Sequence, residues 1–424
     1  MGGVLGISFV ALLIIGMPIP FCLGLSSIFA LAAGNMDMVL FPQRIIAGTD
    51  SFSLLAIPFF ILAGEIMDRG GLSKRLIEFA NVLVGHITGG LAMTTVIAAT
   101  FFGAISGSAP ATTAAIGSIT VPEMEKRGYD RNFAAALASA VGPIGQMIPP
   151  SIPMVIWAVM ANISISKLFL AGIMPGLLMA ISLMAVSYFI AKKKGWKGRS
   201  RRATGKELLH AFVDGFWALL SPVIILGGIY GGIFTPTEAA AVSVIYGLLV
   251  GVFIYKNIKL PDLYPMFSQA VKMTIVVVFV ISTASLFGWI TASEQIAQKV
   301  VQGLLSVTTS KILIMLIINV LLLIIGCFMD NIAAMVILCS VLSSVAANIG
   351  VDPVHFGAIV VINFAVGMCT PPVGYSLFVG SAISDLSIEQ VSKAIWPFVL
   401  TEIAVLFLIT YVPQIVLFIP TVFK

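Results

Sequence analysis

The sequence predicts an all-helical protein that crosses a lipid bilayer several times and is built from two inverted repeats. Its composition, its recurring apolar segments and a similarity between its halves carry this prediction. Of the 424 residues, 59% are hydrophobic and 10% are charged, whereas a soluble domain carries about 25% charged residues. So few charged residues cannot cover a water-exposed surface, so most of the surface is expected to face lipid. Apolar windows of roughly 17–25 residues, the length of a membrane helix, recur along the chain, and the alternation typical of a β-barrel is absent.

Charge and cysteine usage narrow the class of function further. The net charge of +5 does not indicate nucleic-acid binding, because the basic residues lie in short loops between apolar segments, where they orient membrane helices. The four cysteines lie in or beside apolar stretches without CxxC spacing, and the three histidines are far apart in the sequence. We therefore expect neither a disulfide framework nor a metal centre built from these residues, and no organic cofactor.

A basic segment, AKKKGWKGRSRRATGKELLH at 191–210, divides the chain. It contains eight basic residues: Lys192, Lys193, Lys194, Lys197, Arg199, Arg201, Arg202 and Lys206. The positive-inside rule predicts that this linker is cytoplasmic. The first repeat is then 1–190, the second repeat is 211–424, and both termini are expected on the periplasmic side.

The two repeats share their backbone-shaping residues. Adding 222 to the numbering of the first half, for example from 128 to 350, aligns these residues without a gap. The pairs are Gly128 and Gly350, Asp130 and Asp352, Gly145 and Gly367, Pro149 and Pro371, Pro150 and Pro372, and Pro175 and Pro397. The first copy begins with the basic stretch EMEKRGYDR, whereas the equivalent ANIGVDPVH has no Lys or Arg. Equivalent loops are therefore expected on opposite sides of the membrane, which is the inverted repeat of secondary transporters.

The apolar segments give the expected elements in order. The first repeat has crossings at about 4–17, 21–33, 54–68 and 167–191, a re-entrant hairpin at about 93–124 and a broken helix at about 132–162. The second has crossings at about 214–233, 237–254, 268–290 and 388–418, a hairpin at about 312–349 and a broken helix at about 355–385. The region 4–33 could instead be one kinked crossing, because Pro18 and Pro20 suit a kink as well as a turn.

Paired prolines predict where the two helices break. They stand in GQMIPPSIP, from Gly145 to Pro153, and in GMCTPPVGY, from Gly367 to Tyr375. Proline removes a backbone donor and blocks the carbonyl four residues before it. In a membrane such a break persists only where protein or a water-filled cavity surrounds it, and the freed carbonyls suit a cation. A break repeated in both halves favours a binding site over a packing kink.

The expected hairpin tips carry different chemistry. The first tip, SGSAPATT, is rich in small residues and hydroxyls that can coordinate ions, although they also suit close helix packing. The second tip, in GCFMDNIAAMVIL, has Asp330 and Asn331 instead. An acid within an apolar stretch is expected to be paired or functional. Glu294 and Glu402 are predicted near helix ends, at the membrane interface. No hydrolase or nucleotide-binding motif is present, so we do not expect an enzyme.

Several longer motifs resemble a known family. The runs FFGAISGSAPATTAAIGSITVPEM, IPPSIPMVIWAV, KLFLAGIMPG, GGIFTPTEAAAV and MCTPPVG are similar to the large membrane subunit of tripartite ATP-independent periplasmic (TRAP) transporters. The resemblance covers essentially the whole chain. It implies an elevator-type carrier, with scaffold and transport domains each drawn from both repeats, that takes up an organic acid with Na⁺ across a bacterial inner membrane. It also implies two partners, a small four-helix membrane subunit and a periplasmic substrate-binding protein. Because the sequence starts at its first helix, that subunit is expected to be a separate chain.

The resemblance also implies two sodium sites where the hairpin tips meet the breaks. The residues expected at the first are Ser106, Ser108, Gly142 and Gly145. Those expected at the second are Gly367, Thr370 and Gly374, with Asp330 or Asn331. The substrate, of the sialic acid or C4-dicarboxylate class, is expected near Ser108, Ala109, Pro150 and Pro372. The main alternative is a proton-coupled carrier that uses Asp330; a channel and a membrane hydrolase are less favoured.

Overall fold

The computed structural model describes residues 1–422, and within this range it contains helices and connecting turns but no strand. Seven of the described helices are long and apolar enough to cross a membrane. Two bent helix pairs in the same range, Leu40–Ala47 with Phe52–Arg69 and Arg131–Met147 with Ile152–Met160, would raise the number to nine. The predicted all-helical membrane fold is therefore confirmed.

The two repeats follow a similar order of elements, although each has short elements that the other lacks. The first contains α1 (Gly2–Ile14), α2 (Ile19–Ala33), α3 (Leu40–Ala47), the short 3-10 helix η1 (Phe52–Leu55), α4 (Ala56–Arg69), α5 (Leu72–Val84), α6 (Gly90–Ser106), α7 (Ala109–Lys126), α8 (Arg131–Ala140), α9 (Ile144–Met147), α10 (Ile152–Met160) and α11 (Ile165–Lys194). The second contains α12 (Gly205–Tyr230), α13 (Pro236–Leu249), the π-helix η2 (Val250–Ile254), α14 (Leu260–Ser293), α15 (Ile296–Val307), α16 (Lys311–Phe328), α17 (Asn331–Asn348), α18 (Pro353–Gly367), α19 (Tyr375–Ser384), α20 (Ile388–Tyr411) and α21 (Pro413–Val422).

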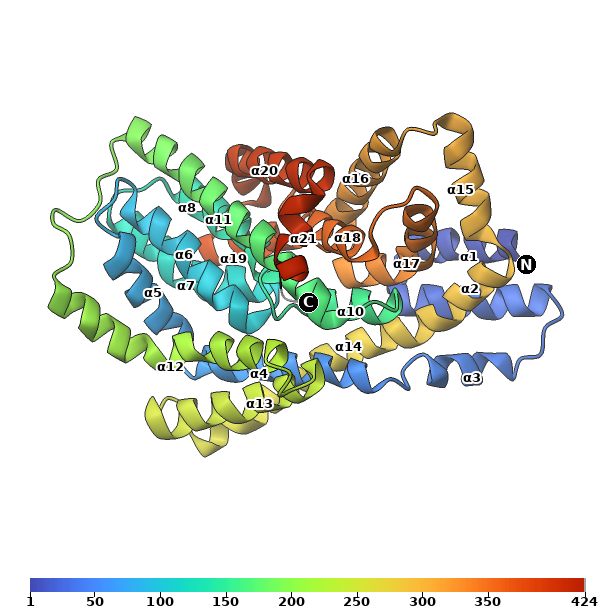
Figure 1. Ribbon diagram of the computed structural model, residues 1–424, viewed down its shortest axis with the longest axis horizontal. Coiled ribbons are helices and arrows are strands. Elements are labelled where there is room, and N and C mark those ends of the chain that lie inside the picture. Colours follow the sequence, from blue (N-terminus) through green and yellow to red (C-terminus); the bar gives the residue numbers. More distant parts are fainter. Residues whose placement is uncertain (423–424) are drawn as a thin grey trace.

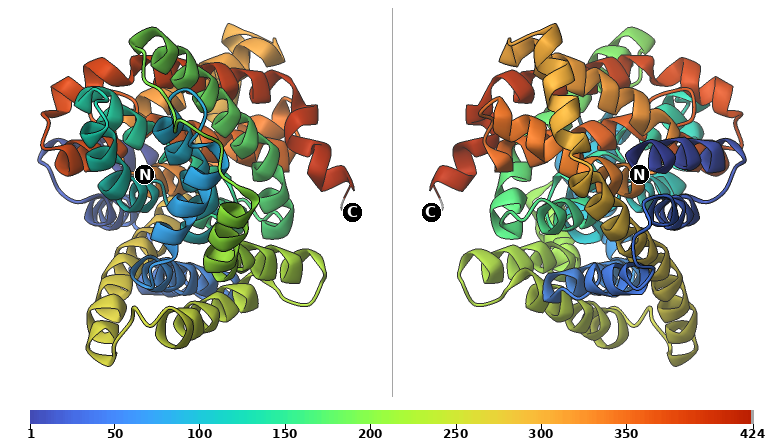
Figure 2. Two further views of the ribbon diagram at one scale, coloured as in Figure 1. Left: turned by 90° about the vertical axis from the view of Figure 1, so that its left-hand side faces the viewer. Right: turned by 90° about the vertical axis from the view of Figure 1, so that its right-hand side faces the viewer.

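The helices separate into two groups. In Figure 1, α12, α13, α4, α14 and α3 run along the lower edge, and the hairpins and broken helices lie above them. Both views of Figure 2 show the same separation. In the lower group the two repeats pack on each other, because α13 and α14 of the second repeat both pack on α4 of the first.

Equivalent residues of the two repeats build equivalent local structure. Asp130 caps α8 by accepting hydrogen bonds from the backbone N–H groups of residues 132 and 133. Asp352 caps α18 in the same way, from residues 354 and 355, both at 2.9 Å. The glycines that precede these caps, Gly128 and Gly350, both have left-handed backbones, with φ of 79° and 63°. An aspartate cap after a left-handed glycine is thus one local design used twice.

The two copies run in opposite directions, as the packing around α20 shows. This helix has 24 residues and is about 36 Å long at 1.5 Å per residue. Arg131, which opens α8, pairs with Asp385 just before α20 begins, at 3.3 Å. His355, in the first turn of α18, instead contacts the carbonyl of Ile409, near the other end of α20, at 2.9 Å. Helices α8 and α18 therefore start at opposite ends of α20, which confirms the inverted repeat.

The basic linker and the loop between α7 and α8, which are both predicted to be cytoplasmic, lie together. Trp196, in the basic linker, stacks on Tyr129, in the loop between α7 and α8, with ring centroids 4.6 Å apart. The backbone N–H of Gly89 donates to the carbonyl of Trp196 at 3.0 Å. The linker is shorter than the predicted 191–210, because α11 continues to Lys194 and Thr204 already caps α12.

Several element boundaries differ from the sequence predictions. The region 4–33 forms two helices, α1 and α2, which pack on each other. The predicted crossing at 54–68 is preceded by α3, with a bend of 61° between them. The predicted helix at 388–418 ends at Tyr411, because Pro413 begins a new helix, α21, as is common for proline at a first helical position. Helices α5 and α15 were not expected, because each is short, with 13 and 12 residues, and contains charged residues.

Candidate functional site

The first hairpin turns at a left-handed glycine and a serine cap. Gly107, with φ of 61°, ends α6, and the hydroxyl of Ser108 accepts a hydrogen bond from the N–H of Ala111 to cap α7. The hydroxyls of Ser106 and Thr112 lie 3.0 Å apart and are buried. Hydroxyls of two consecutive helices therefore gather at this tip.

The second hairpin turns at an aspartate cap. The Asp330 carboxylate accepts hydrogen bonds from the N–H groups of Ile332 at 3.0 Å and Ala333 at 3.1 Å. The neighbouring Asn331 directs its amide away from this cap and toward the first repeat. Asp330 and Asn331, the alternatives predicted for the second site, thus have different partners. Helices α16 and α17 also pack mainly on other elements, with α16 on α18 and α17 on α15, α14 and α10.

Each proline pair interrupts its helix between two helical segments. In the first break, α8 and the single turn α9 lead to an extended segment, and Ser151 caps α10 by accepting from the N–H of Met154 at 3.4 Å. In the second, α18 ends at Gly367 and α19 begins at Tyr375. Both proline pairs have cis peptide bonds. The breaks differ in exposure, because Pro150 is buried whereas Pro372 is exposed.

Backbone contacts join each hairpin to the break of its own repeat. The N–H of Ile152 donates to the carbonyl of Gly107 at 3.3 Å, and the N–H of Gly374 donates to the carbonyl of Cys327 at 3.1 Å. At each of these two contacts a pair of glycines, one on the hairpin and one at the break, allows the two backbones to approach closely. A Cβ atom built on Gly103 would lie 2.8 Å from the Cα of Gly145, and one built on Gly367 would lie 2.8 Å from the Cα of Gly326.

Oxygen atoms surround the first break where the first sodium site is predicted. A Cβ atom on Gly145 would lie 3.0 Å from the carbonyl oxygen of Ser108. One on Gly142 would lie 3.0 Å from the carbonyl oxygen of Ala109 and 3.1 Å from the Ser376 hydroxyl. The predicted residues Ser106, Ser108, Gly142 and Gly145 therefore lie together, with Ala109 from the predicted substrate set.

Three further hydroxyl residues belong to this cluster and were not predicted. Thr112 contacts Ser106, and Thr113 and Ser376 have buried hydroxyls without a hydrogen-bond partner. Thr112 and Thr113 belong to the quoted SGSAPATT motif, so its composition was a usable signal. Ser376 comes from α19, in the second repeat, and only the tertiary structure brings it here.

The second predicted site is more open. The Thr370 hydroxyl donates to the carbonyl of Val366 at 2.8 Å, which leaves its lone pairs free to accept or coordinate. Gly374 has a left-handed backbone with φ of 45°, and a Cβ atom there would lie 2.9 Å from the carbonyl oxygen of Thr370. Gly367, Thr370 and Gly374 thus lie together at the second break.

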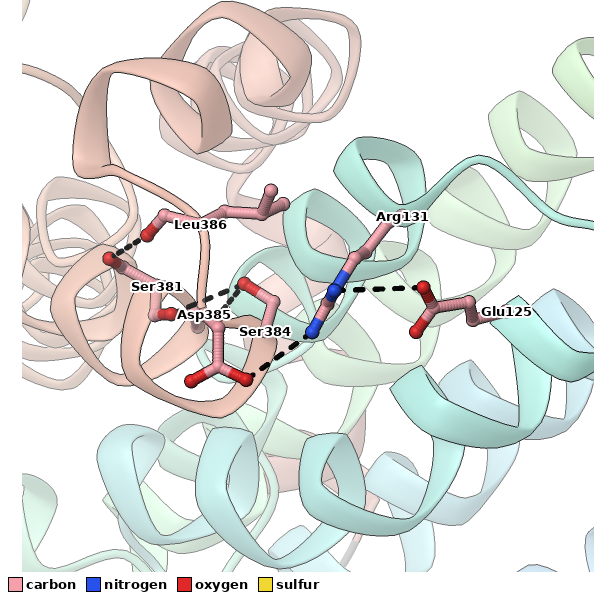
Figure 3. A network of polar contacts seen from close by, with 7 residues as sticks. Glu125, Arg131, Ser381, Ser384, Asp385 and Leu386 are labelled. Carbon is pink, nitrogen blue, oxygen red and sulfur yellow. Dashed lines mark hydrogen bonds and ion pairs between the residues drawn. The ribbon is translucent and has the colours of Figure 1, made fainter.

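The helix that follows each break packs against helices of the other repeat. Helix α10 packs on α17 and α18, and α19 packs on α7 and α8. Figure 3 shows how the end of α19 is held: Arg131 lies between Glu125, at 3.6 Å, and Asp385, at 3.3 Å. The Ser381 hydroxyl donates to the carbonyl of Leu386 and closes the turn beside them. The two breaks are therefore parts of one interlocked unit.

Glu402 does not lie at the membrane interface, so that prediction is wrong. It lies inside α20 with no exposed surface, and one carboxylate oxygen accepts a hydrogen bond from the Cys369 thiol at 2.7 Å. The other oxygen has no partner. The predicted segment 388–418 already places Glu402 near its middle, so an interfacial position did not follow from that segment, and α20 keeps Glu402 nine residues before its last residue, Tyr411. A buried carboxyl group therefore stands directly behind the second break.

The donor set at the breaks determines which ligands they suit. Hydroxyl and carbonyl oxygens dominate, and among residues 1–422 no group of three or more His, Cys, Asp or Glu side chains could hold a metal ion. Such oxygens are hard ligands that suit hard cations. Serine caps at α7 and α10 also leave helix N-termini at the breaks, where partial positive charge favours an anion.

The sequence of this chain matches those of known membrane transporters. The family description "Tripartite ATP-independent periplasmic transporter, DctM component" matches residues 6–415. The isethionate TRAP transporter permease protein DctMQ of Oleidesulfovibrio alaskensis is 48% identical over 411 residues, which are 97% of this chain and 65% of that longer protein. The C4-dicarboxylate TRAP transporter large permease protein DctM of Rhodobacter capsulatus is 39% identical and covers 97% of both chains.

Another permease and a solved transporter structure are also similar to this chain. The sialic acid TRAP transporter large permease protein SiaM of Vibrio cholerae is 39% identical over 97% of this chain and 96% of its own. These relatives are named as permeases, not as enzymes. The crystal structure of the Alcanivorax borkumensis YdaH transporter has a TM-score of 0.62 over 87% of each chain at 12% identity, so this likeness concerns the fold alone.

Proposed function

Because this chain belongs to the DctM component family of tripartite ATP-independent periplasmic transporters, we propose that it moves an organic acid across the membrane by sodium-coupled elevator transport. The observation that carries the proposal is the meeting of two hairpin tips with two helix breaks inside one interlocked unit. At both meeting points backbone carbonyls and hydroxyls converge without a cluster of acidic or metal-ligating side chains in residues 1–422.

Sodium coupling is supported by the oxygen atoms around the breaks. Ser106, Ser108, Gly142 and Gly145 would hold one ion, and Gly367, Thr370 and Gly374 another. Na⁺ binding would order each hairpin against its break and complete the substrate site between them. Asp330 accepts two backbone hydrogen bonds as a helix cap. A capping carboxylate already has a structural role, which favours sodium over proton coupling through this residue.

An elevator movement is supported by the division of the helices into two groups. The hairpins and breaks of both repeats interlock through α10 and α19, so they would move together as the transport domain. The group along the lower edge of Figure 1, with α4, α13 and α14, would be the scaffold. Helices α5 and α15 precede the hairpins in their repeats and would connect the two domains.

The substrate is proposed to be a small organic anion of the class that the relatives' names share. Isethionate, C4-dicarboxylates and sialic acid all carry an acidic group. The substrate would lie near Ser108, Ala109, Pro150 and Pro372, where helix N-termini favour its negative charge. Pro150 is buried and Pro372 is exposed.

The proposed setting is a bacterial inner membrane with two partners. A periplasmic binding protein would deliver the substrate, and a small four-helix membrane subunit would complete the permease, either as a separate chain or joined to this one. The DctMQ relative is longer than the aligned region, which supports the joined arrangement. The DctM relative of Rhodobacter capsulatus is matched over 97% of its length, which supports the separate one. The basic linker would face the cytoplasm and both termini the periplasm.

Transport by the reconstituted system tests the proposal. The ligand of the partner binding protein is first identified by thermal shift with a set of organic acids. Uptake of that ligand is then measured in proteoliposomes that contain the permease subunits. An inward Na⁺ gradient is expected to drive accumulation, and a K⁺ gradient of equal size is not. Equal uptake with K⁺ would refute sodium coupling, and uptake driven by a pH gradient alone would favour the proton-coupled alternative.

A further inference from the structure

One side chain lies at the point where the two repeats meet. Adding the repeat offset of 222 to 146 gives 368, so Gln146 and Met368 occupy equivalent positions. These two residues touch, with the Gln146 amide nitrogen donating to the Met368 sulfur at 3.4 Å. A contact between equivalent residues of two inverted copies lies on the axis that relates them. Gln146 is therefore at the centre of the interlocked unit.

A second side-chain hydrogen bond bridges the two repeats at this centre, and it has no counterpart related by the repeat symmetry. The Gln146 carbonyl oxygen accepts a hydrogen bond from the Asn331 side chain at 2.9 Å. The residue equivalent to Asn331 is Ala109 (331 − 222), and the residue equivalent to Gln146 is Met368. Because neither side chain has an amide group, Ala109 and Met368 cannot form the equivalent hydrogen bond. Gln146, Asn331 and Met368 are 3%, 2% and 2% exposed. The bridge is thus buried, where water competes little for its polar groups.

Gln146 is rigidly joined to the first predicted sodium site. It follows Gly145, whose backbone lies against Ser108 and Thr112. The turn that carries it, α9, is held by hydrogen bonds from the N–H of Gly145 to the carbonyl of Gly142 at 2.8 Å and from the N–H of Gln146 to the carbonyl of Pro143 at 3.0 Å. An ion that orders Gly142 and Gly145 would therefore fix the Gln146 side chain as well.

The partners of Gln146 are joined to the second predicted site. Met368 follows Gly367, and its carbonyl accepts from the N–H of Ser376 at 2.8 Å, which holds the start of α19. Asn331 is the first residue of α17, at the second hairpin tip. An ion that orders the second break or the second hairpin tip would therefore also fix the side-chain amide of Gln146.

From these contacts we infer that Gln146 is a positioning residue that couples the two sodium sites, so that occupation of one raises the affinity of the other. The inference rests on the sodium coupling proposed above and deepens it. Coupling between two sites commonly corresponds to about a 5–150-fold change in affinity, and the Hill coefficient can approach the number of sites. The Gln146 amide carries the buried side-chain bridge in this coupling.

The test is a sodium titration of the purified chain at constant ionic strength, with choline replacing Na⁺ and with thermal stability as the readout. The wild-type chain is expected to give a Hill coefficient near two. Gln146→Met keeps a long unbranched side chain but loses the amide, so its coefficient is expected near one, with half-saturation at least about fivefold higher. Gln298→Met, the same change at an exposed position of α15, is the matched control and is expected to behave as wild type.

Two further variants separate coupling from general packing. Asn331→Ala removes the bridge from the other side and is expected to lower the Hill coefficient in the same way, which also covers the case in which Gln146→Met does not fold. The exchange Gln146→Asn with Asn331→Gln keeps the summed length of the two side chains and is expected to restore the coefficient toward that of wild type.

The outcomes distinguish the inference from the proposed function. If the wild type binds Na⁺ cooperatively and a folded Gln146→Met or Asn331→Ala chain keeps the same Hill coefficient, the coupling role of Gln146 is refuted while sodium coupling stands. If the wild type does not respond to Na⁺ in either this titration or uptake, sodium coupling itself is refuted, and the inference is refuted with it.

Discussion

Replacement of Gly367 by alanine tests whether the second hairpin must meet the second break through bare backbone. A Cβ atom at this position would lie 2.8 Å from the Cα, 2.9 Å from the carbonyl carbon and 3.2 Å from the carbonyl oxygen of Gly326. Favourable carbon–carbon contacts lie at about 3.5–4.0 Å. All three atoms are backbone, so no rotamer change relieves the contact, and α16 and α18 must separate by roughly half an ångström or more.

The expected cost is that of an overpacked core, about 1–3 kcal/mol of unfolding free energy. Gly227→Ala is the matched control, because Gly227 lies inside α12 and a Cβ atom there has no neighbour within 4 Å. At an open helical position alanine is favoured over glycine by up to about 1 kcal/mol. Denaturant unfolding in detergent measures both variants, and a sodium titration is expected to show weaker binding for Gly367→Ala only. Equal stability and equal sodium affinity of the two variants would refute the close-contact reasoning.

Three other substitutions give distinct expected results. Ser106→Ala removes a buried hydroxyl from the first predicted site, so a sodium titration is expected to require more Na⁺ for half-saturation; an unchanged titration would remove Ser106 from the site. Cys369→Ala leaves the Glu402 carboxyl without a hydrogen-bond partner and is expected to lower the unfolding free energy by about 1–3 kcal/mol, whereas recovery on adding Glu402→Leu would identify the unpaired carboxyl as the cause. Asp385→Asn removes one exposed partner of Arg131 and is expected to cost less than about 1 kcal/mol; a larger loss would mean that the turn depends on this pair.

The architecture was predictable because its key residues act locally. Paired prolines, an aspartate cap and a left-handed glycine each shape the few residues around them, so their repetition at one offset reveals two copies of one design. The difference in basic residues before the two copies was enough to predict their inversion. Packing at the two ends of α20 confirms that inversion through Asp385 and Ile409.

Other features depend on contacts that no local pattern contains. Gln146 and Asn331 are 185 residues apart, and nothing in either motif indicates that their side chains meet. The contribution of Ser376 to the first break follows from the exchange of α10 and α19 between repeats. The burial of Glu402 depends on packing around α20, since its thiol partner Cys369 comes from the second break, 33 residues earlier in the chain.

The number of sodium ions bound per chain tests most directly the claim that the two opposed breaks form two cation sites. Radioactive sodium bound to the purified chain, measured at saturation by scintillation proximity, is expected to give two ions per wild-type chain. At the Na⁺ concentration that just saturates the wild type, it is expected to give about one ion after either Ser106→Ala or Thr370→Ala, because each variant weakens the site at a different break. A wild-type chain that binds no sodium, or two variants that both still bind two ions, would contradict the claim.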